Sequence, residues 1–336
     1  MNKKTFKTVL STVAAAVALS ACTMIPKYEQ PQVEVAETFK YDTFDDGIRA
    51  ADLGWQDFFA DPRLHRLIDI ALERNTDLRT AALNAEIYRK QYMIARNDLL
   101  PSINASGTGT RVGSLSGGVT RSEYTVGLGA AAYELDLFGR VRSNSQAALQ
   151  GYFSVAANRD AAHLALIAAV AKAHFNELYA QESMALAQRV LKTRETTYKL
   201  SQMRHKAGVI SAVDLRQQEA LIESAKADYA NAVKNREQAR NALATLINQP
   251  LPEDLPAALP LSKQFKITRL PAGLSSEVLL NRPDIRAAEH SLKQANANIG
   301  AARAAFFPTI SLTGSVGTAS SELSGLFKSG TGIWSF

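Results

Sequence analysis

The amino-acid sequence predicts a mainly α-helical protein that carries a membrane β-hairpin and is built as a tandem structural repeat. Three observations predict this fold. Residues 140–248 contain no proline and are typical of two very long helices, and residues 124–132, within a β-like stretch at 101–137, alternate apolar with small side chains. A segment that starts near residue 76 also recurs near residue 283, and an internal repeat of this kind determines the architecture to be expected.

Composition excludes several functional classes. Of the 336 residues, 46% are apolar and 21% are charged, which fits neither a disordered nor a collagen-like chain. The net charge is +6, but three lysines in the first 21 residues have no acid beside them, so the rest has 35 basic against 32 acidic residues. Basicity therefore does not indicate nucleic-acid binding. With one cysteine and five scattered histidines, we expect no disulfide framework and no metal site.

The N-terminus is predicted to be a lipoprotein signal peptide over residues 1–21. A basic start is followed by an apolar stretch at residues 8–19, which is too short to span a bilayer. The stretch ends in Leu-Ser-Ala-Cys, which resembles the lipobox of bacterial lipoproteins, and Cys22 is then the lipidated residue. The alternative is an ordinary cleavage site with a chance cysteine behind it. Because Thr23 is not the aspartate that retains such lipoproteins in the inner membrane, the outer membrane is favoured.

An internal repeat begins after an N-terminal segment at residues 22–75. Asp77-Leu78-Arg79 recurs as Asp284-Ile285-Arg286, and Pro101-Ser102-Ile103 recurs 207 residues later as Pro308-Thr309-Ile310. The unit is a helix over about 76–98, ended by a proline that cannot continue the helix. An extended stretch rich in Gly, Ser and Thr follows it.

A β-hairpin is predicted over residues 101–137, with a Gly- and Ser-rich turn at 113–122. In the second strand, Tyr124 to Ala132 alternates apolar with small residues and carries no charge, as in a membrane barrel strand with its apolar side to lipid. A soluble half-buried hairpin is the alternative. No stretch after Cys22 offers about 18 uninterrupted apolar residues, so we expect no transmembrane helix.

Two long helices are predicted over 140–206 and 212–248, interrupted at Gly208. The first would be a rod of about 100 Å, and the pair is expected to form a long antiparallel α-hairpin that completes a first repeat over 76–248. A lone coiled coil is the alternative. A proline-rich linker at 249–274 leads to a second repeat at 275–336, which lacks a second α-hairpin, so the chain is expected to be C-terminally truncated.

Four stretches, together with the lipobox, resemble one known family. They are YELDLFGR at 133–140, GWQDFFADP at 54–62, RHKAGVISAVDL at 204–215 and NRPDI at 281–285. They are similar to the strand-to-helix junction, the N-terminal segment, the helical tip and the opening of the second repeat in the outer membrane factor family. The resemblance is to its lipoprotein branch, the TolC-like channels of tripartite efflux pumps.

The resemblance implies a homotrimer in the outer membrane, lipid-anchored and extending into the periplasm. Each subunit would give strands to a shared transmembrane β-barrel and long helices to a periplasmic α-barrel tunnel. The implied partners are a periplasmic adaptor protein, an inner-membrane RND-type pump and outer-membrane lipid, with no nucleic acid. The implied function is export of drugs and other toxic small molecules, without catalysis, cofactor or metal.

The tip between the long helices is the predicted contact site for the adaptor. Gly208 suits a tight turn, Ser211 suits a helix cap, and Val209 and Ile210 would be exposed apolar residues. The resemblance places Asp214 in the region of the closed aperture. The alternative is that the tip only connects two helices.

Three other functions are weighed against efflux. The same fold serves type I protein secretion, and a non-pore lipoprotein could bridge the envelope. An enzyme is the third, since His174, Glu177 and Glu182 lie on one predicted helix, but we interpret these as part of a solvated face. His163 and His174 are three turns apart, about 16 Å, and cannot share a metal.

Overall fold

This computed structural model describes residues 23–30, 53–115, 117–267 and 277–336. Cys22 and the predicted signal peptide lie outside the described residues. The chain divides into two compact units, of which the first comprises 1–32, 84–156 and 286–336 and the second comprises 33–83 and 157–285. The predicted division of the sequence into repeats and linker stays a prediction.

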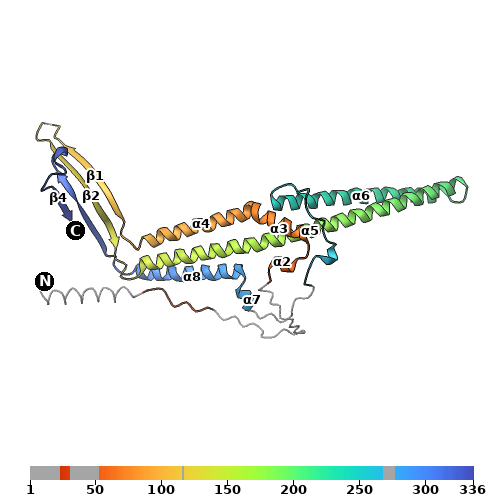
Figure 1. Ribbon diagram of the computed structural model, residues 1–336, viewed down its shortest axis with the longest axis horizontal. Coiled ribbons are helices and arrows are strands. Elements are labelled where there is room, and N and C mark those ends of the chain that lie inside the picture. Colours follow the sequence, from red (N-terminus) through yellow and green to blue (C-terminus); the bar gives the residue numbers. More distant parts are fainter. Residues whose placement is uncertain (1–22, 31–52, 116, 268–276) are drawn as a thin grey trace. The chain divides into compact units, whose positions relative to one another are not determined.

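The long helices lie mostly in the second unit, although residues 140–156 at the start of α5 belong to the first unit. Helix α5 spans Arg140–Lys206, with 67 residues, and α6 spans Ala212–Ile247, with 36 residues. The sequence predicts 140–206 and 212–248 for this pair. At 1.5 Å per residue, α5 is about 100 Å long. Figure 1 shows α6 running beside the C-terminal part of α5, and the two helices are joined by a short turn.

The core of the second unit is built around a short helix, α3, at Pro62–Arg74. Its start is well defined, because Pro62 occupies the first turn and the Asp61 carboxylate accepts a 2.9 Å hydrogen bond from the Arg63 N–H. Apolar residues recur at helical spacing and point into the core. The fully buried members of this cluster are Leu64, Leu67, Ile68, Ala71, Val170, Leu243 and Ile247. Burial of each Leu or Ile stabilises the unit by about 1.5–3 kcal/mol.

Smaller elements complete the second unit. The four-residue helix α2 spans Trp55–Phe58, η2 spans Leu261–Lys263 and α7 spans Glu277–Leu280. Phe59 pairs with Phe265 in an isolated antiparallel bridge, which ties the chain before α3 to the chain after α6. The segment that precedes α3 and the segment that follows α6 therefore meet over the core.

The first unit is built on a four-stranded antiparallel sheet in the order β1-β2-β3-β4. Its strands are β1 at Ile103–Val112, β2 at Arg121–Glu134, β3 at Ser311–Ser320 and β4 at Gly332–Ser335. A single-turn 3-10 helix, η3 at Leu323–Gly325, lies between β3 and β4. The expected mixture of long helices and a membrane-type hairpin is confirmed. The hairpin of β1 and β2 is also extended to a four-stranded sheet, because β2 pairs with β3 of the second repeat.

The repeat in the sequence is also a repeat of elements. Helix α4 spans Thr76–Asn97 and α8 spans Pro283–Ala304, so both ends of α8 lie 207 residues after those of α4. Strand β1 follows α4 as β3 follows α8. Among the described residues, no helix combines the length and the apolar character that a membrane crossing requires.

Candidate functional site

The sheet has one apolar and one polar face. Cross-strand partners point to the same side of an antiparallel sheet, and Leu128 is paired with Ala105 on one side and with Val316 on the other. The apolar face carries Ile103, Ala105, Tyr124, Val126, Leu128, Val316 and Trp334. Its large side chains are exposed, with 53% for Leu128, 63% for Val316 and 80% for Trp334. A continuous exposed apolar face of this kind marks a surface that contacts lipid or another protein.

The opposite face is lined by small polar side chains. Thr108 and Thr125 share a hydrogen bond across β1 and β2, and Ser315 and Ser335 share one of 2.7 Å across β3 and β4. A hollow of about 440 Å³ lies along it. At its centre Gly127 brings two backbones together, since a Cβ there would lie 2.7 Å from the Val316 carbonyl oxygen. The face is rich in hydroxyls and glycines, with Ile333 on the edge strand as an apolar exception, and it is suited to contact with water.

A β-bulge adjusts the alternation near the end of β2. The register with β3 shifts between Ala130 and Tyr133, and Ala132 has φ of 53°. Because the bulge inserts one residue, Tyr133 joins the apolar face opposite Leu312. Its hydroxyl donates a 3.0 Å hydrogen bond to the Leu99 carbonyl. The sequence pattern did not reveal this change of face.

The junction between β2 and α5 is fixed by two charged pairs. The Asp136 carboxylate accepts hydrogen bonds from the backbone N–H groups of Val141 (2.9 Å) and Arg142 (3.0 Å), and so caps the helix. The Arg142 guanidinium bonds the same carboxylate at 2.9 Å, and Arg140 pairs with Glu134. A carboxylate at a helix N-terminus is favourable, and these pairs give the YELDLFGR stretch its structural role.

At the other end of α5, the helix stops in a Schellman motif. Gly208 has φ of 72°, a conformation that glycine adopts without strain. The Val209 N–H donates to the Arg204 carbonyl and the Gly208 N–H donates to the His205 carbonyl, both at 2.9 Å. The basic residues of the last turn also suit the negative end of the helix dipole. Gly208 is therefore required by the geometry of the turn.

Helix α6 begins with a capping box. The Asp214 N–H donates to the Ser211 hydroxyl oxygen at 3.1 Å, and the Ser211 N–H donates to the Asp214 carboxylate at 3.1 Å. Hydrogen bonds from the hydroxyl and N–H of Ser211 hold the pKa of Asp214 below its ordinary value. The structure thus gives Asp214 a local role at the helix start.

The apolar surface of the tip differs in detail from the expected pair. Val209 is 62% exposed, whereas Ile210 is half-buried and its carbonyl lies 3.0 Å from the His205 Nδ1. Two apolar residues that the sequence analysis did not single out, Met203 and Val213, are exposed as fully as Val209. Their positions one turn before and one turn after the loop could have indicated this.

The interpretation of His174 and Glu177 as part of a solvated face was wrong. Both side chains are buried, and His174 is 0% exposed. The His174 Nε2 donates a 3.1 Å hydrogen bond to the Asp61 Oδ2, which fixes the tautomer because a carboxylate only accepts. The same oxygen accepts from the Leu259 N–H at 3.1 Å and from the Gln264 side-chain amide at 3.0 Å. Asp61 thereby joins three distant segments.

A second ion pair flanks this network. The Arg63 guanidinium lies 3.3 Å from the Glu177 carboxylate, and the His174 Nδ1 lies 3.9 Å from the other Glu177 oxygen. Burial lowers the pKa of His174, although the hydrogen bond to Asp61 opposes this. For Asp61, burial would raise the pKa, but the hydrogen bonds from Gln264, His174 and the backbone outweigh it and lower the pKa. The pair is a neutral imidazole against a carboxylate.

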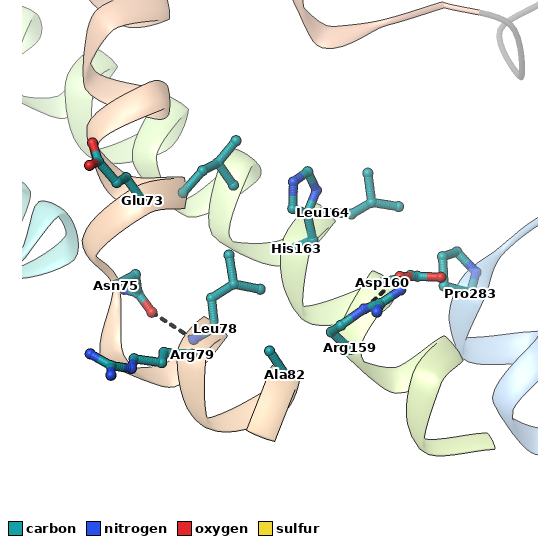
Figure 2. Close-up of a pocket in the computed structure, with 11 residues that line it drawn as sticks. Glu73, Asn75, Leu78, Arg79, Ala82, Arg159, Asp160, His163, Leu164 and Pro283 are labelled. Carbon is teal, nitrogen blue, oxygen red and sulfur yellow. Dashed lines mark hydrogen bonds and ion pairs between the residues drawn. The ribbon is translucent and has the colours of Figure 1, made fainter. Parts of the chain in front are cut away.

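A groove of about 700 Å³ lies elsewhere in the second unit, between α4 and α5 (Figure 2). Asn75 lies at its edge and caps α4, since its side-chain oxygen accepts hydrogen bonds from the N–H groups of Asp77 and Leu78. Arg159 and Asp160 form an ion pair within it, and His163 lines it. His174 does not line it, so the two histidines belong to different sites. Among the described residues, no three His, Cys, Asp or Glu side chains gather in a way that could hold a metal ion.

A two-faced antiparallel sheet joined to a 67-residue helix is the architecture expected of a channel-forming protein. Residues 67–249 and 274–336 match the family described as outer membrane efflux protein. The crystal structure of the open state of the MtrE outer membrane channel from Neisseria gonorrhoeae superposes with a TM-score of 0.87 and 73% sequence identity, over 94% of this chain and 71% of that chain.

Two curated relatives agree with this match. The antibiotic efflux pump outer membrane protein ArpC of Pseudomonas putida is 42% identical over 98% of this chain and 70% of its own length. The cation efflux system protein CusC of Escherichia coli K12 is 39% identical over 96% of this chain and 71% of its own length. The chain belongs to the outer membrane efflux protein family, as its motifs predict, and is the outer-membrane channel component of an efflux pump rather than an enzyme.

Proposed function

We propose that this channel exports drugs and other toxic small molecules as a homotrimer, anchored by lipid on Cys22. The observation that carries the proposal is the two-faced sheet. Its apolar face exposes Leu128 and Val316 for contact with lipid, and its polar face offers hydroxyls and glycines to a water-filled lumen. Relatives that are named for antibiotic and cation efflux support small molecules or ions as the cargo.

The tip is the proposed docking site for a periplasmic adaptor, which would join the channel to an inner-membrane RND-type pump. Gly208 and Ser211 shape the turn, and Val209, with Met203 and Val213, supplies exposed apolar surface. Ile210 contributes a partly exposed side chain. Asp214 is proposed to lie near the closed aperture, where its carboxylate also caps α6.

Deletion of the gene in its host tests the transport function. Loss of the channel is expected to lower the minimal inhibitory concentrations of several drugs at least fourfold, and the native gene on a plasmid should restore them. Unchanged drug sensitivity together with loss of a secreted protein would show a type I secretion channel. Unchanged sensitivity and unchanged secretion would show a non-pore envelope protein.

Lipid attachment is tested by metabolic labelling with a radioactive fatty acid. The wild-type protein should carry label and Cys22→Ser should carry none, because acylation requires the thiol. Label retained on the variant would reject Cys22 as the attachment site. This measurement is independent of drug resistance.

Adaptor docking is tested at the exposed tip. Val209→Asp combined with Ile210→Asp places two charges in the apolar contact and should reduce in vivo cross-linking to the adaptor at least fivefold. Val190→Asp is the matched control, because Val190 is also exposed on α5 (43%) but lies several turns from the loop. Equal cross-linking in both variants would show that the loop only connects two helices.

A further inference from the structure

The short segment Thr23–Gln30 lies along helix α8 in the first unit, and its central contact requires a glycine. A Cβ placed on Gly300 would lie 2.9 Å from both the Cα and the backbone N of Ile25. Real Cβ atoms do not approach backbone this closely, so any larger residue at position 300 would displace the segment. Gly300 is buried in the structure.

Two polar contacts continue along the same face of α8. The Asn296 side-chain amide donates a 2.8 Å hydrogen bond to the Pro26 carbonyl, and the Lys293 ammonium lies 5.2 Å from the centroid of the Tyr28 ring. The second contact is a cation–π interaction. The Thr23 hydroxyl oxygen also accepts a 3.3 Å hydrogen bond from the Ile25 N–H, which forms a local turn at the start of the segment.

The contacts have a consistent direction and spacing. From Lys293 to Gly300 the helix rises about 10 Å, and from Tyr28 to Ile25 three extended residues also cover about 10 Å. The segment therefore runs antiparallel to α8. Its N-terminal end, at Thr23, is directed toward the C-terminal end of the helix. That end is Ala304, about 6 Å beyond Gly300, and β3 starts a few residues later.

We propose that Lys293, Asn296 and Gly300 form a socket that clamps the Thr23–Tyr28 strap and so fixes the lipid anchor beside the sheet. The proposal rests on the lipid attachment at Cys22. Three residues of chain reach at most about 10 Å, so an acylated residue 22 would be confined to within that distance of Ile25.

The end of α8 suits contact with the bilayer surface. Phe306 is 91% exposed there, and Leu100, at nearly the equivalent place in the first repeat, is 68% exposed. A clamped strap would hold the acyl chains at the level of these side chains and of the adjoining apolar sheet face. The socket thus sets the depth of the anchor, which a free tether of the same length would leave undefined.

Spin-label distances on the full-length protein in detergent test the clamp. Lys27 and Ala302 are exposed and lie outside the socket contacts, so Lys27→Cys and Ala302→Cys can carry the two labels. Acylated Cys22 has no free thiol and takes no label. We expect a narrow distribution of the distance between the two labels in the otherwise wild-type protein. Gly300→Ala should at least double the width of this distribution.

Gly151→Ala is the matched control, because it adds the same methyl group to a helix glycine that faces only the flexible end of Gln294. It should leave the distribution narrow. Ile25→Gly is a second disrupting variant, which removes the side chain from the strap without touching α8, and it should broaden the distribution as well.

The outcomes separate the two proposals. A broad distribution in the parent protein, or one that Gly300→Ala and Ile25→Gly leave unchanged, would overturn the socket. The mass of the N-terminal peptide is measured in parallel. Absence of acyl groups on Cys22 would overturn the lipid anchor and the anchoring role of the socket, whereas an acylated Cys22 with a broad distribution would overturn the socket alone.

Discussion

Replacement of Asp61 by alanine should be one of the most destabilising single changes in the second unit. The carboxylate is fully buried and accepts hydrogen bonds from the Arg63 and Leu259 N–H groups, from the Gln264 amide and from the His174 imidazole. These donors come from α3, from α5 and from the chain after α6. One side chain thus holds three segments that are distant in the sequence.

The magnitude follows from the groups that the substitution leaves behind. The Leu259 N–H and the His174 ring would lose their acceptor, whereas the Gln264 amide would keep its 2.6 Å hydrogen bond to the Leu259 carbonyl. A buried donor without a partner costs about 1–3 kcal/mol. The lost cap of α3 costs about 1 kcal/mol. We therefore expect the free energy of unfolding to fall by about 4 kcal/mol in Asp61→Ala.

Urea unfolding followed by tryptophan fluorescence measures this change. The chain has two tryptophans, and Trp55 packs against the core, so a Trp334→Phe background reports on the second unit. Asp69→Ala is the control, because Asp69 is an exposed acid on the same helix and its loss should change stability by less than about 0.5 kcal/mol. Equal unfolding midpoints for the two variants would refute the network as a source of stability.

Three further predictions concern titration, strand packing and the tip. Burial lowers the pKa of His174, so below about pH 6.5 the unfolded chain binds a proton that the folded protein does not. The free energy of unfolding, measured by urea titration, should therefore be highest above that pH and fall on acidification. In His174→Gln it should fall less steeply with decreasing pH. Gly127→Val should reduce assembled protein in outer-membrane fractions at least fivefold, whereas Gly107→Val, where a Cβ would meet only the Val126 side chain at 3.6 Å, should not. Ser211→Ala should destabilise the first turn of α6 by about 1 kcal/mol, because the helix loses its N-cap. The amide hydrogens of that turn should then exchange faster, and unchanged exchange would contradict the capping role.

The long elements and the tip could be predicted from the sequence for physical reasons. The stretch from residue 140 to 248 contains no proline and is rich in Ala, Glu, Gln and Lys, which favour helix, and Gly208 marks the break between its two helices. Ser211 followed by Asp214 is a local cap signal that needs no tertiary information. Helices α4 and α8 begin and end 207 residues apart because the two copies of the repeat share the residues that start and stop the helix.

The buried network was missed although the sequence held signals for it, whereas the strap could not be predicted from any local pattern. His174 lies on the stripe formed by Ile167, Val170 and Ala171, and this spacing could have indicated that it faces inward. The Asp61-Pro62 pair at the start of α3 is also a helix-start signal, although no helix was predicted within the N-terminal segment 22–75. The contact of Ile25 with Gly300, however, joins residues 275 positions apart, and no local pattern specifies it.

The distribution of buried residues suggests why the tip depends so strongly on local signals. From residue 181 to residue 221, through the end of α5, the loop and the start of α6, no residue is buried, whereas both helices contribute to the core near α3. This distal part of the hairpin is held by helix propensity, by its caps and by exposed i, i+3 pairs such as Arg216 with Glu219. Segments with few buried contacts open at low free energy, so binding to a partner can order them. A docking surface at Val209 would therefore stabilise the part of the chain that has no core of its own.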